Sequence, residues 1–69
     1  NLDQVILDCS KAIELNAKHA NAYYNRALAY FKKKQYINGL KDLRKAQALG
    51  CKIDPEFIEI LKDAAGIEK

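Results

Sequence analysis

Apolar residues recur at intervals of three and four along most of the chain, which is the spacing of one face of an α-helix. Polar segments at 16–19 and 32–35 and a glycine at Gly50 interrupt this pattern. No segment alternates apolar and polar residues with a period of two, and no Asn-Gly or Asp-Gly pair marks a hairpin. The sequence therefore predicts an all-α fold of four helices with antiparallel neighbours, because the connections are short. These helices are expected near residues 2–15, 20–33, 36–49 and 54–65.

Two helix ends carry local signals. Gly50 follows the third apolar stretch, and glycine adopts the left-handed conformation that ends many helices with little strain. Asp54 and Pro55 precede the fourth stretch, where aspartate is a favoured N-cap and proline a favoured first helical residue.

The second predicted helix is apolar over a wider arc than a helix with one neighbour needs. Two apolar stripes run along it, so we expect it to pack against neighbours on two sides. The stripes are Tyr23, Ala27 and Tyr30, and Tyr24, Leu28 and Phe31.

The chain repeats itself at an offset of 34 residues. The pattern D-x-x-K-A-x-x-L begins at Asp8 and again at Asp42, and Tyr23, Tyr24 and Ala27 fall on aromatic or apolar counterparts. The first and third helices are therefore predicted to be one kind of element, and the second and fourth the other. A repeated helix pair stacked side by side is a solenoid.

A repeat of this length with two helices resembles the tetratricopeptide repeat. Where that family has W-x-x-L-G-x-x-Y, the chain has Tyr23-x-x-Arg26-Ala27-x-x-Tyr30, and Gly39-x-x-x-Leu43 stands for A-x-x-x-F. The resemblance implies a single helix-hairpin solenoid domain over residues 1–69. It divides this domain into a half repeat at 1–19, a full repeat at 20–53 and a C-terminal half repeat or capping helix at 54–69.

Three positions of the repeat carry residues that are unusual for their place in the helices or turns. Arg26 stands where the family pattern has leucine, so its guanidinium needs a buried partner or a path to solvent. Lys34 replaces a usual turn glycine. Gly39 is expected to allow close approach of two helix backbones, at a helix-propensity cost of about 1 kcal/mol relative to alanine.

Composition fits a soluble, folded chain, with 49% apolar residues and 30% charged residues. No apolar run approaches the roughly 20 residues that cross a bilayer. The net charge of +3 is too small to argue for nucleic acid. Two cysteines without metal-ligand spacing favour a reduced, intracellular and cytoplasmic setting. The first residue is not methionine, so we expect the chain to be cut from a longer parent.

The inventory of reactive groups predicts no enzyme, no metal and no cofactor. His19 is the single histidine and is expected to be a solvated turn residue. Ser10 has no adjacent histidine to activate it. Cys9 lies on the apolar stripe of the first helix and is expected in the core, whereas Cys51 is expected near the surface.

Four carboxylates have a lysine three or four residues further along, and such surface pairs contribute a few tenths of a kcal/mol each. The predicted pairs are Glu14 with Lys18, Asp8 with Lys11, Asp42 with Lys45, and Glu59 with Lys62.

The resemblance implies a protein–protein interaction module, a scaffold or adaptor. In this family the first helix of each pair lines a concave groove that receives a segment of a partner protein or peptide. Two of these roles have alternatives. Tyr24 packs against the next helix in one, and Asn25 is an ordinary surface residue in the other. One sub-class of the family binds a C-terminal carboxylate through a set of lysines, asparagines and an arginine. Such a clamp is not predicted here, because only Asn25 matches a residue of that set. The implied groove residues are Asn21, Tyr24, Asn25, Leu28 and Lys32 from the second helix, with Ile58 and Lys62 from the fourth.

Two other functions stay open. The run Lys32-Lys33-Lys34 lies beside Tyr30, Phe31 and Tyr36, and lysines beside aromatics can bind nucleic acid. Both tyrosines fall on core positions, which makes nucleic acid the weaker interpretation. A structural spacer within a larger protein is the other.

The ends of the repeat raise a further expectation, because arrays with fewer than about three repeats leave end faces uncovered. Either the tail Gly66-Ile67-Glu68-Lys69 and polar positions cap these end faces, or the chain associates with copies of itself.

Overall fold

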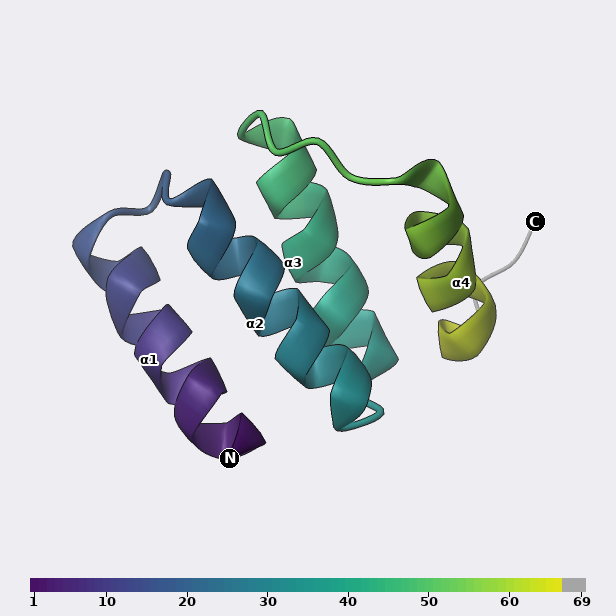
Figure 1. The fold of residues 1–69 in the computed structure, drawn as a ribbon, viewed down its shortest axis with the longest axis horizontal. Helices are drawn as coiled ribbons and strands as arrows, with labels where there is room; N and C mark the ends of the chain where they lie inside the picture. Colours follow the sequence, from purple (N-terminus) through teal and green to yellow (C-terminus); the bar gives the residue numbers. More distant parts are fainter. Residues whose placement is uncertain (67–69) are drawn as a thin grey trace.

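A computed structural model describes residues 1–66 of the chain, and these form four α-helices. Successive helices run antiparallel (Figure 1), and the described residues contain no strand. The predicted all-α, four-helix class is confirmed, with every predicted helix end within one residue of the observed one. The helices are α1 (Leu2–Leu15), α2 (Ala20–Lys32), α3 (Tyr36–Ala48) and α4 (Pro55–Ala65).

Side chains cap three of the helices at their N-termini. Asp54 accepts a hydrogen bond from the Glu56 amide at 2.9 Å, with Pro55 as the first residue of α4, which confirms the predicted cap. Asn1 does the same for α1, accepting from the Gln4 amide at 3.2 Å. The Nδ1 atom of His19 accepts from the Ala22 amide at 3.3 Å. His19 is exposed, as predicted, but it also begins α2.

The turns use left-handed backbone where the sequence indicated it. Gly50 has φ of 103°, which confirms the predicted helix-ending glycine after α3. Lys34, in the position of a usual turn glycine, has φ of 66° and is the sole non-glycine residue among 1–66 with positive φ. A lysine side chain is disfavoured in that conformation, so the α2–α3 turn is a point of backbone strain.

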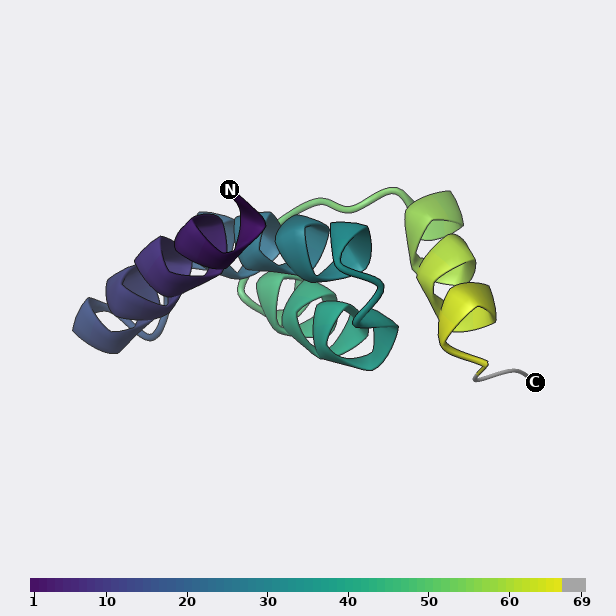
Figure 2. The same ribbon diagram turned by 90° about the horizontal axis from the view of Figure 1, so that it is seen from below.

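The four helices form an open array with dimensions of 35 × 26 × 14 Å. Neighbours in the chain pack together: α1 against α2, α2 against α3, and α3 against α4. Viewed at right angles to the first direction, α3 lies below α2, while α1 and α4 lie at opposite ends (Figure 2). The chain is therefore not a closed bundle. The division into one full and two half repeats stays a prediction.

The core lies where α2, α3 and α4 meet. Its centre consists of Ala27, Leu40, Leu43 and Leu61. The small residues bring backbones close: a Cβ on Gly39 would lie 3.1 Å from the carbonyl oxygen of Ala27. This contact agrees with the close approach expected at Gly39.

Aromatic rings connect three helices around this core. The rings of Phe31 and Tyr36 lie 5.5 Å apart at 61°, and those of Phe31 and Phe57 lie 5.9 Å apart at 76°. Edge-to-face pairs of this kind contribute about 0.5–1.5 kcal/mol beyond the area they bury. Phe31 thus joins α2 to both α3 and α4.

The two predicted stripes of α2 are both used, since this helix packs against α1 and α3 and contributes to the core shared with α4. By contrast, α1 has no fully buried residue. Its side chains Val5 and Leu7 are 39% and 48% exposed. One face of α1 is therefore left without a neighbour among residues 1–66.

Candidate functional site

Arg26 of α2 lies at the centre of the array and contacts both α1 and α3. Its Nε and Nη2 atoms donate to Oδ2 and Oδ1 of Asp42 on α3, at 2.6 and 2.9 Å. Its Nη1 atom donates to Oγ of Ser10 on α1 at 3.0 Å. The Ser10 hydroxyl in turn donates to the carbonyl oxygen of Ile6 at 2.7 Å. The predicted need of Arg26 for a partner is thus met by Asp42.

The predicted surface pair of Asp42 with Lys45 is wrong. Asp42 is only 7% exposed and turns toward α2, where Arg26 takes both of its carboxylate oxygens. The rings of Tyr23 and Tyr30 flank the guanidinium, with centroids 5.8 and 5.9 Å from its central carbon. The hydrogen bonds to Asp42 raise the pKa of Arg26 further above its ordinary value. This cation is therefore fixed in the interior as a structural group.

The other predicted ion pairs differ in outcome. Glu59 and Lys62 do pair, at 3.6 Å. Among residues 1–66, Glu14 and Lys18 form no ion pair and neither do Asp8 and Lys11, so those two predictions are wrong. The carboxylate of Asp8 instead accepts from Nε2 of Gln4, one turn away on α1, at 2.9 Å.

One part of the implied groove faces α1. Asn25, Leu28 and Lys32 of α2 line a hollow of about 330 Å³. Asn25 and Lys32 are exposed, and Leu28 is half-buried. Asn21 is exposed at the beginning of α2, on the same helical stripe but outside the hollow. The remaining lining residues are Leu2, Val5, Asp8 and Cys9 of α1 and Ala29 of α2.

The other part faces α4. Tyr24 and Ile58 are half-buried and pack against the core cluster, and Lys62 is half-buried beside its partner Glu59. The structure therefore places three of the seven implied residues in the hollow beside α1 and two on α4, and it does not bring all seven into one pocket. Tyr24 uses part of its ring for packing, which was the alternative considered for it.

The lysine run has different surroundings at each position. Lys32 is exposed at the α1–α2 hollow, Lys33 pairs with Asp3 of α1, and Lys34 is exposed in the turn. The neighbouring aromatic rings are engaged in packing: Phe31 and Tyr36 contact one another, and Tyr30 flanks Arg26. No aromatic platform beside the lysines results from this arrangement.

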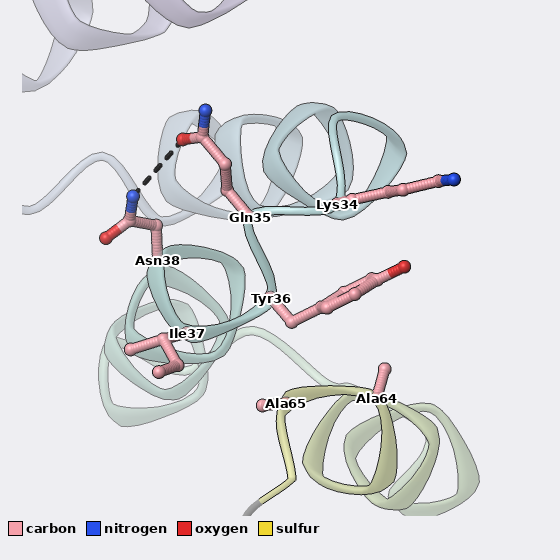
Figure 3. A pocket seen from close by; sticks show the side chains of 7 residues that line it. All are labelled: Lys34, Gln35, Tyr36, Ile37, Asn38, Ala64 and Ala65. Carbon is pink, nitrogen blue, oxygen red and sulfur yellow. Dashed lines mark hydrogen bonds between the residues drawn. The ribbon is translucent and has the colours of Figure 1, made fainter.

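A second hollow, of about 340 Å³, lies between the α2–α3 turn and the end of α4. In Figure 3 the ring of Tyr36 lies between Lys34 and Ala64, with Gln35 and Asn38 joined by a hydrogen bond of 3.2 Å. None of the implied groove residues lies in it.

Reactive groups are sparse in residues 1–66. They contain no cluster of three or more histidine, cysteine or acidic side chains placed to hold a metal ion. Burial raises the pKa of the Cys9 thiol above its ordinary value of 9.0, an effect that the nearby Arg26 charge partly offsets. Cys9 and Cys51 are both half-buried. No helix within the described range is long and apolar enough to cross a membrane.

Comparison with known proteins gives two matches. Residues 9–48 match a family model described as "Tetratricopeptide repeat". A stretch of 43 residues is 44% identical to the E3 ubiquitin-protein ligase CHIP of Arabidopsis thaliana. This stretch covers 62% of the chain but only 16% of the ligase, so the chain spans a small part of that relative. No solved structure matches the chain significantly.

Proposed function

This chain belongs to the tetratricopeptide repeat family, whose members are in general protein–protein interaction modules, and from that premise we propose that it binds a partner segment on the concave face of the repeat, along α2 and onto α4. The partner is a segment of a protein or a peptide. The chain acts as a scaffold or adaptor in the cytoplasm. No catalytic step, metal or cofactor forms part of the proposal. The proposed contact residues are Asn21, Tyr24, Asn25, Leu28, Lys32, Ile58 and Lys62.

The observation that carries the proposal is the polar stripe of α2. Asn21 and Asn25 are exposed, and their side chains make no hydrogen bond with any other residue in 1–66. A side-chain amide can both donate to and accept from a peptide backbone. Leu28, on the same stripe, adds apolar contact area. The stripe therefore offers hydrogen-bond donors, acceptors and apolar surface to the main chain of a partner, and binding there leaves the core contacts intact.

The charge of this face indicates the kind of segment. Lys32 is exposed and forms no ion pair within the described residues. Lys62 is paired only with Glu59, whose side chain is 68% exposed, and such surface pairs contribute at most about 1 kcal/mol. Both lysines can therefore turn to a new carboxylate. We expect a segment in which acidic residues alternate with apolar ones.

The test is selection of random 12-residue peptides on the immobilised 69-residue chain. Peptides rich in acidic and apolar residues are the expected result. Their binding is then measured to variants Asn25→Ala and Lys32→Gln, each expected to weaken binding about fivefold, because one contact of this kind contributes about 1 kcal/mol. Lys45→Gln, an exposed lysine on α3, is the matched control. Equal binding to all three variants would contradict the proposal.

The same protein sample separates the alternatives. A labelled single-stranded oligonucleotide that bound in a salt-sensitive manner, and lost affinity on changing Lys32, Lys33 and Lys34 to glutamine, would favour nucleic-acid contact instead. A structural spacer would be favoured if Tyr24→Ala and Leu28→Ala left the binding of every selected peptide unchanged.

A further inference from the structure

Glu59 holds the position on α4 that Asn25 holds on α2, since the two residues are separated by the repeat offset of 34. Lys62 corresponds to Leu28 in the same way. The two residues of α2 belong to the stripe that carries the proposed function, so Glu59 and Lys62 form the matching stripe of α4. Where α2 offers an amide and an apolar side chain, α4 therefore offers a carboxylate and an ammonium group.

The two charges of this α4 stripe form an ion pair with each other. Nζ of Lys62 lies 3.6 Å from Oε2 of Glu59, and the Glu59 side chain is mostly exposed to solvent. Within residues 1–66 neither side chain makes a second ion pair. The other charged residues of α4, Glu56 and Asp63, are both acidic. Helix α4 therefore holds no second cation that could replace Lys62 as the partner of Glu59.

A partner carboxylate that binds Lys62 has to displace Glu59. The displaced carboxylate then lies beside the incoming one without a cation of its own, and like charges at neighbouring positions repel one another. A partner that also brings a basic residue avoids this loss, because its cation binds Glu59 while its carboxylate binds Lys62. The internal pair is then exchanged for two pairs between the chain and the partner, with complementary charges across the interface.

We propose that Glu59 is a specificity-determining residue of the groove, and that it selects partner segments in which an acidic residue over α4 is accompanied by a basic one. This inference rests on the proposed function, because it requires that the segment extends from α2 onto α4. Lys32 on α2 forms no ion pair within residues 1–66, so it binds an acidic residue without displacing an internal partner. The two parts of the groove therefore differ: α2 accepts an acidic residue alone, and α4 accepts an acidic and a basic residue together.

The spacing of the two α4 residues sets the spacing in an extended segment. Three residues of α-helix advance by about 4.5 Å. In an extended chain, side chains two positions apart point to the same side and lie about 7 Å apart. The flexible side chains of Glu59 and Lys62 cover the difference, so the acidic and basic residues of the segment are expected two positions apart.

Two fluorescein-labelled peptides of identical composition test this selection, with fluorescence anisotropy as the measure of binding to the 69-residue chain. Both alternate glutamate with leucine and end in two glycines and one further residue. The first has lysine as this last residue. The second has glutamate there and lysine at a central position, two positions from a glutamate on either side. The second peptide is expected to bind about threefold more tightly, because a solvent-exposed ion pair changes affinity by about that factor.

Glu59→Gln is expected to remove this preference, because Lys62 is then free for a carboxylate and the central lysine of the peptide loses its partner. Glu56→Gln is the matched control, since it removes one exposed acidic charge from the same helix and leaves the pair of Glu59 and Lys62 in place. It is expected to change the binding of both peptides equally. Lys32→Gln is expected to weaken both peptides by one common factor, because each presents an acidic residue to α2.

The inference is overturned if the unmodified chain binds both peptides equally, or if Glu59→Gln leaves the preference unchanged. In either case the proposed function stands when Asn25→Ala weakens both peptides, so that variant separates the two failures. Absence of binding by both peptides, or binding that neither Asn25→Ala nor Lys32→Gln changes, would overturn the inference and the proposed function together.

Discussion

Arg26 on α2 and Asp42 on α3 face one another with two parallel hydrogen bonds, at 2.6 and 2.9 Å, although they are 16 residues apart in the chain. Their side chains are 19% and 10% exposed. The third hydrogen bond from the guanidinium, to Ser10, extends the contact to α1. A mostly buried pair whose polar atoms are all partnered holds helices in one register, because each charge is costly to leave alone.

Asp42→Ala is therefore expected to lower the free energy of unfolding by about 3 kcal/mol, since it leaves the Arg26 guanidinium buried without its counter-ion. Urea unfolding followed by circular dichroism at 222 nm measures this loss. Asp3→Asn breaks the ion pair between Asp3 of α1 and Lys33, the residue that follows α2, and is the control. The Asp3 side chain is 76% exposed, so that loss is expected to be about 0.5 kcal/mol. Equal losses in the two variants would show that burial does not distinguish the pairs.

The double variant Arg26→Leu with Asp42→Leu is expected to lose less stability than Asp42→Ala alone, although it removes both charges. Replacing a buried ion pair by apolar residues avoids the desolvation of an unpartnered group. The same urea titration tests this order. A double variant less stable than Asp42→Ala would mean that the hydrogen bonds of Arg26 contribute more than the burial of its charge costs.

Lys34→Gly is expected to raise the free energy of unfolding by about 0.5–1 kcal/mol. Lys34 has φ of 66°, and a side chain in that region costs about 1 kcal/mol that glycine avoids. Lys33→Gly is the adjacent control and is compared with Lys33→Ala, so that both variants lose the ion pair with Asp3; φ there is −85°, and glycine is expected to be destabilising relative to alanine. Thermal and urea unfolding of both variants check the opposite signs, and a loss of stability at both positions would contradict the prediction.

Gly39→Ala is expected to destabilise the chain by about 1 kcal/mol, despite the better helix propensity of alanine. The new Cβ would lie 3.1 Å from the Ala27 carbonyl, which belongs to the backbone of α2 and can yield only if the helices separate. Gly39→Val is expected to lose more. At Gly50, where φ is 103° and no atom lies within 4 Å of an added Cβ, alanine is expected to lose stability through the left-handed backbone alone, and leucine, which is not branched at Cβ, is expected to lose no more than alanine. Unfolding of alanine and leucine variants at Gly50, beside alanine and valine variants at Gly39, separates backbone strain from crowding.

The Cys9 thiol is expected to ionise at a pH above its ordinary value of 9.0 in the folded chain, because burial disfavours the thiolate. Rates of alkylation by iodoacetamide across pH, in a Cys51→Ser background, measure the midpoint. The unfolded chain in urea is expected to return to about 9.0.

The sign of the resulting stability change follows from proton binding. At alkaline pH the folded chain holds the Cys9 proton more tightly than the unfolded chain. The contribution of this thiol to stability is therefore complete below the unfolded pKa and is lost as pH rises through the folded one. A midpoint at or below 9.0 in the folded chain would contradict the expected burial effect.

Local features were read correctly from the sequence because they depend on neighbouring residues. Asp54 followed by Pro55 begins α4, and Gly50 ends α3, since capping and φ preferences act within one turn of helix. The wide apolar arc of α2 correctly indicated neighbours on two sides, because the face that a helix buries is written in its spacing of three and four.

Partner choice could not be read in the same way. Asp42 has Lys45 three residues away and Arg26 in the preceding helix, and helical spacing alone favours the lysine. The packing of α3 against α2 buries Asp42 beside Arg26, and Lys45 stays exposed to solvent. Similarly, Tyr24 and Asn25 are adjacent in sequence and were expected to share one groove. Successive residues of a helix point about 100° apart, so the positions of α1 and α4 decide that Tyr24 faces the core and Asn25 the hollow.

The sequence by itself therefore determined the helices, their ends, the repeat at 34 residues and the small residues at close contacts, since each of these depends on short-range geometry or on side-chain volume. The tertiary structure alone decided which acid meets Arg26, which groove residues stay exposed, and that Asp8 lies in an open hollow whose counterpart on α3 is covered. These properties depend on the distance and angle between helices, which many side chains set together and which no local pattern records.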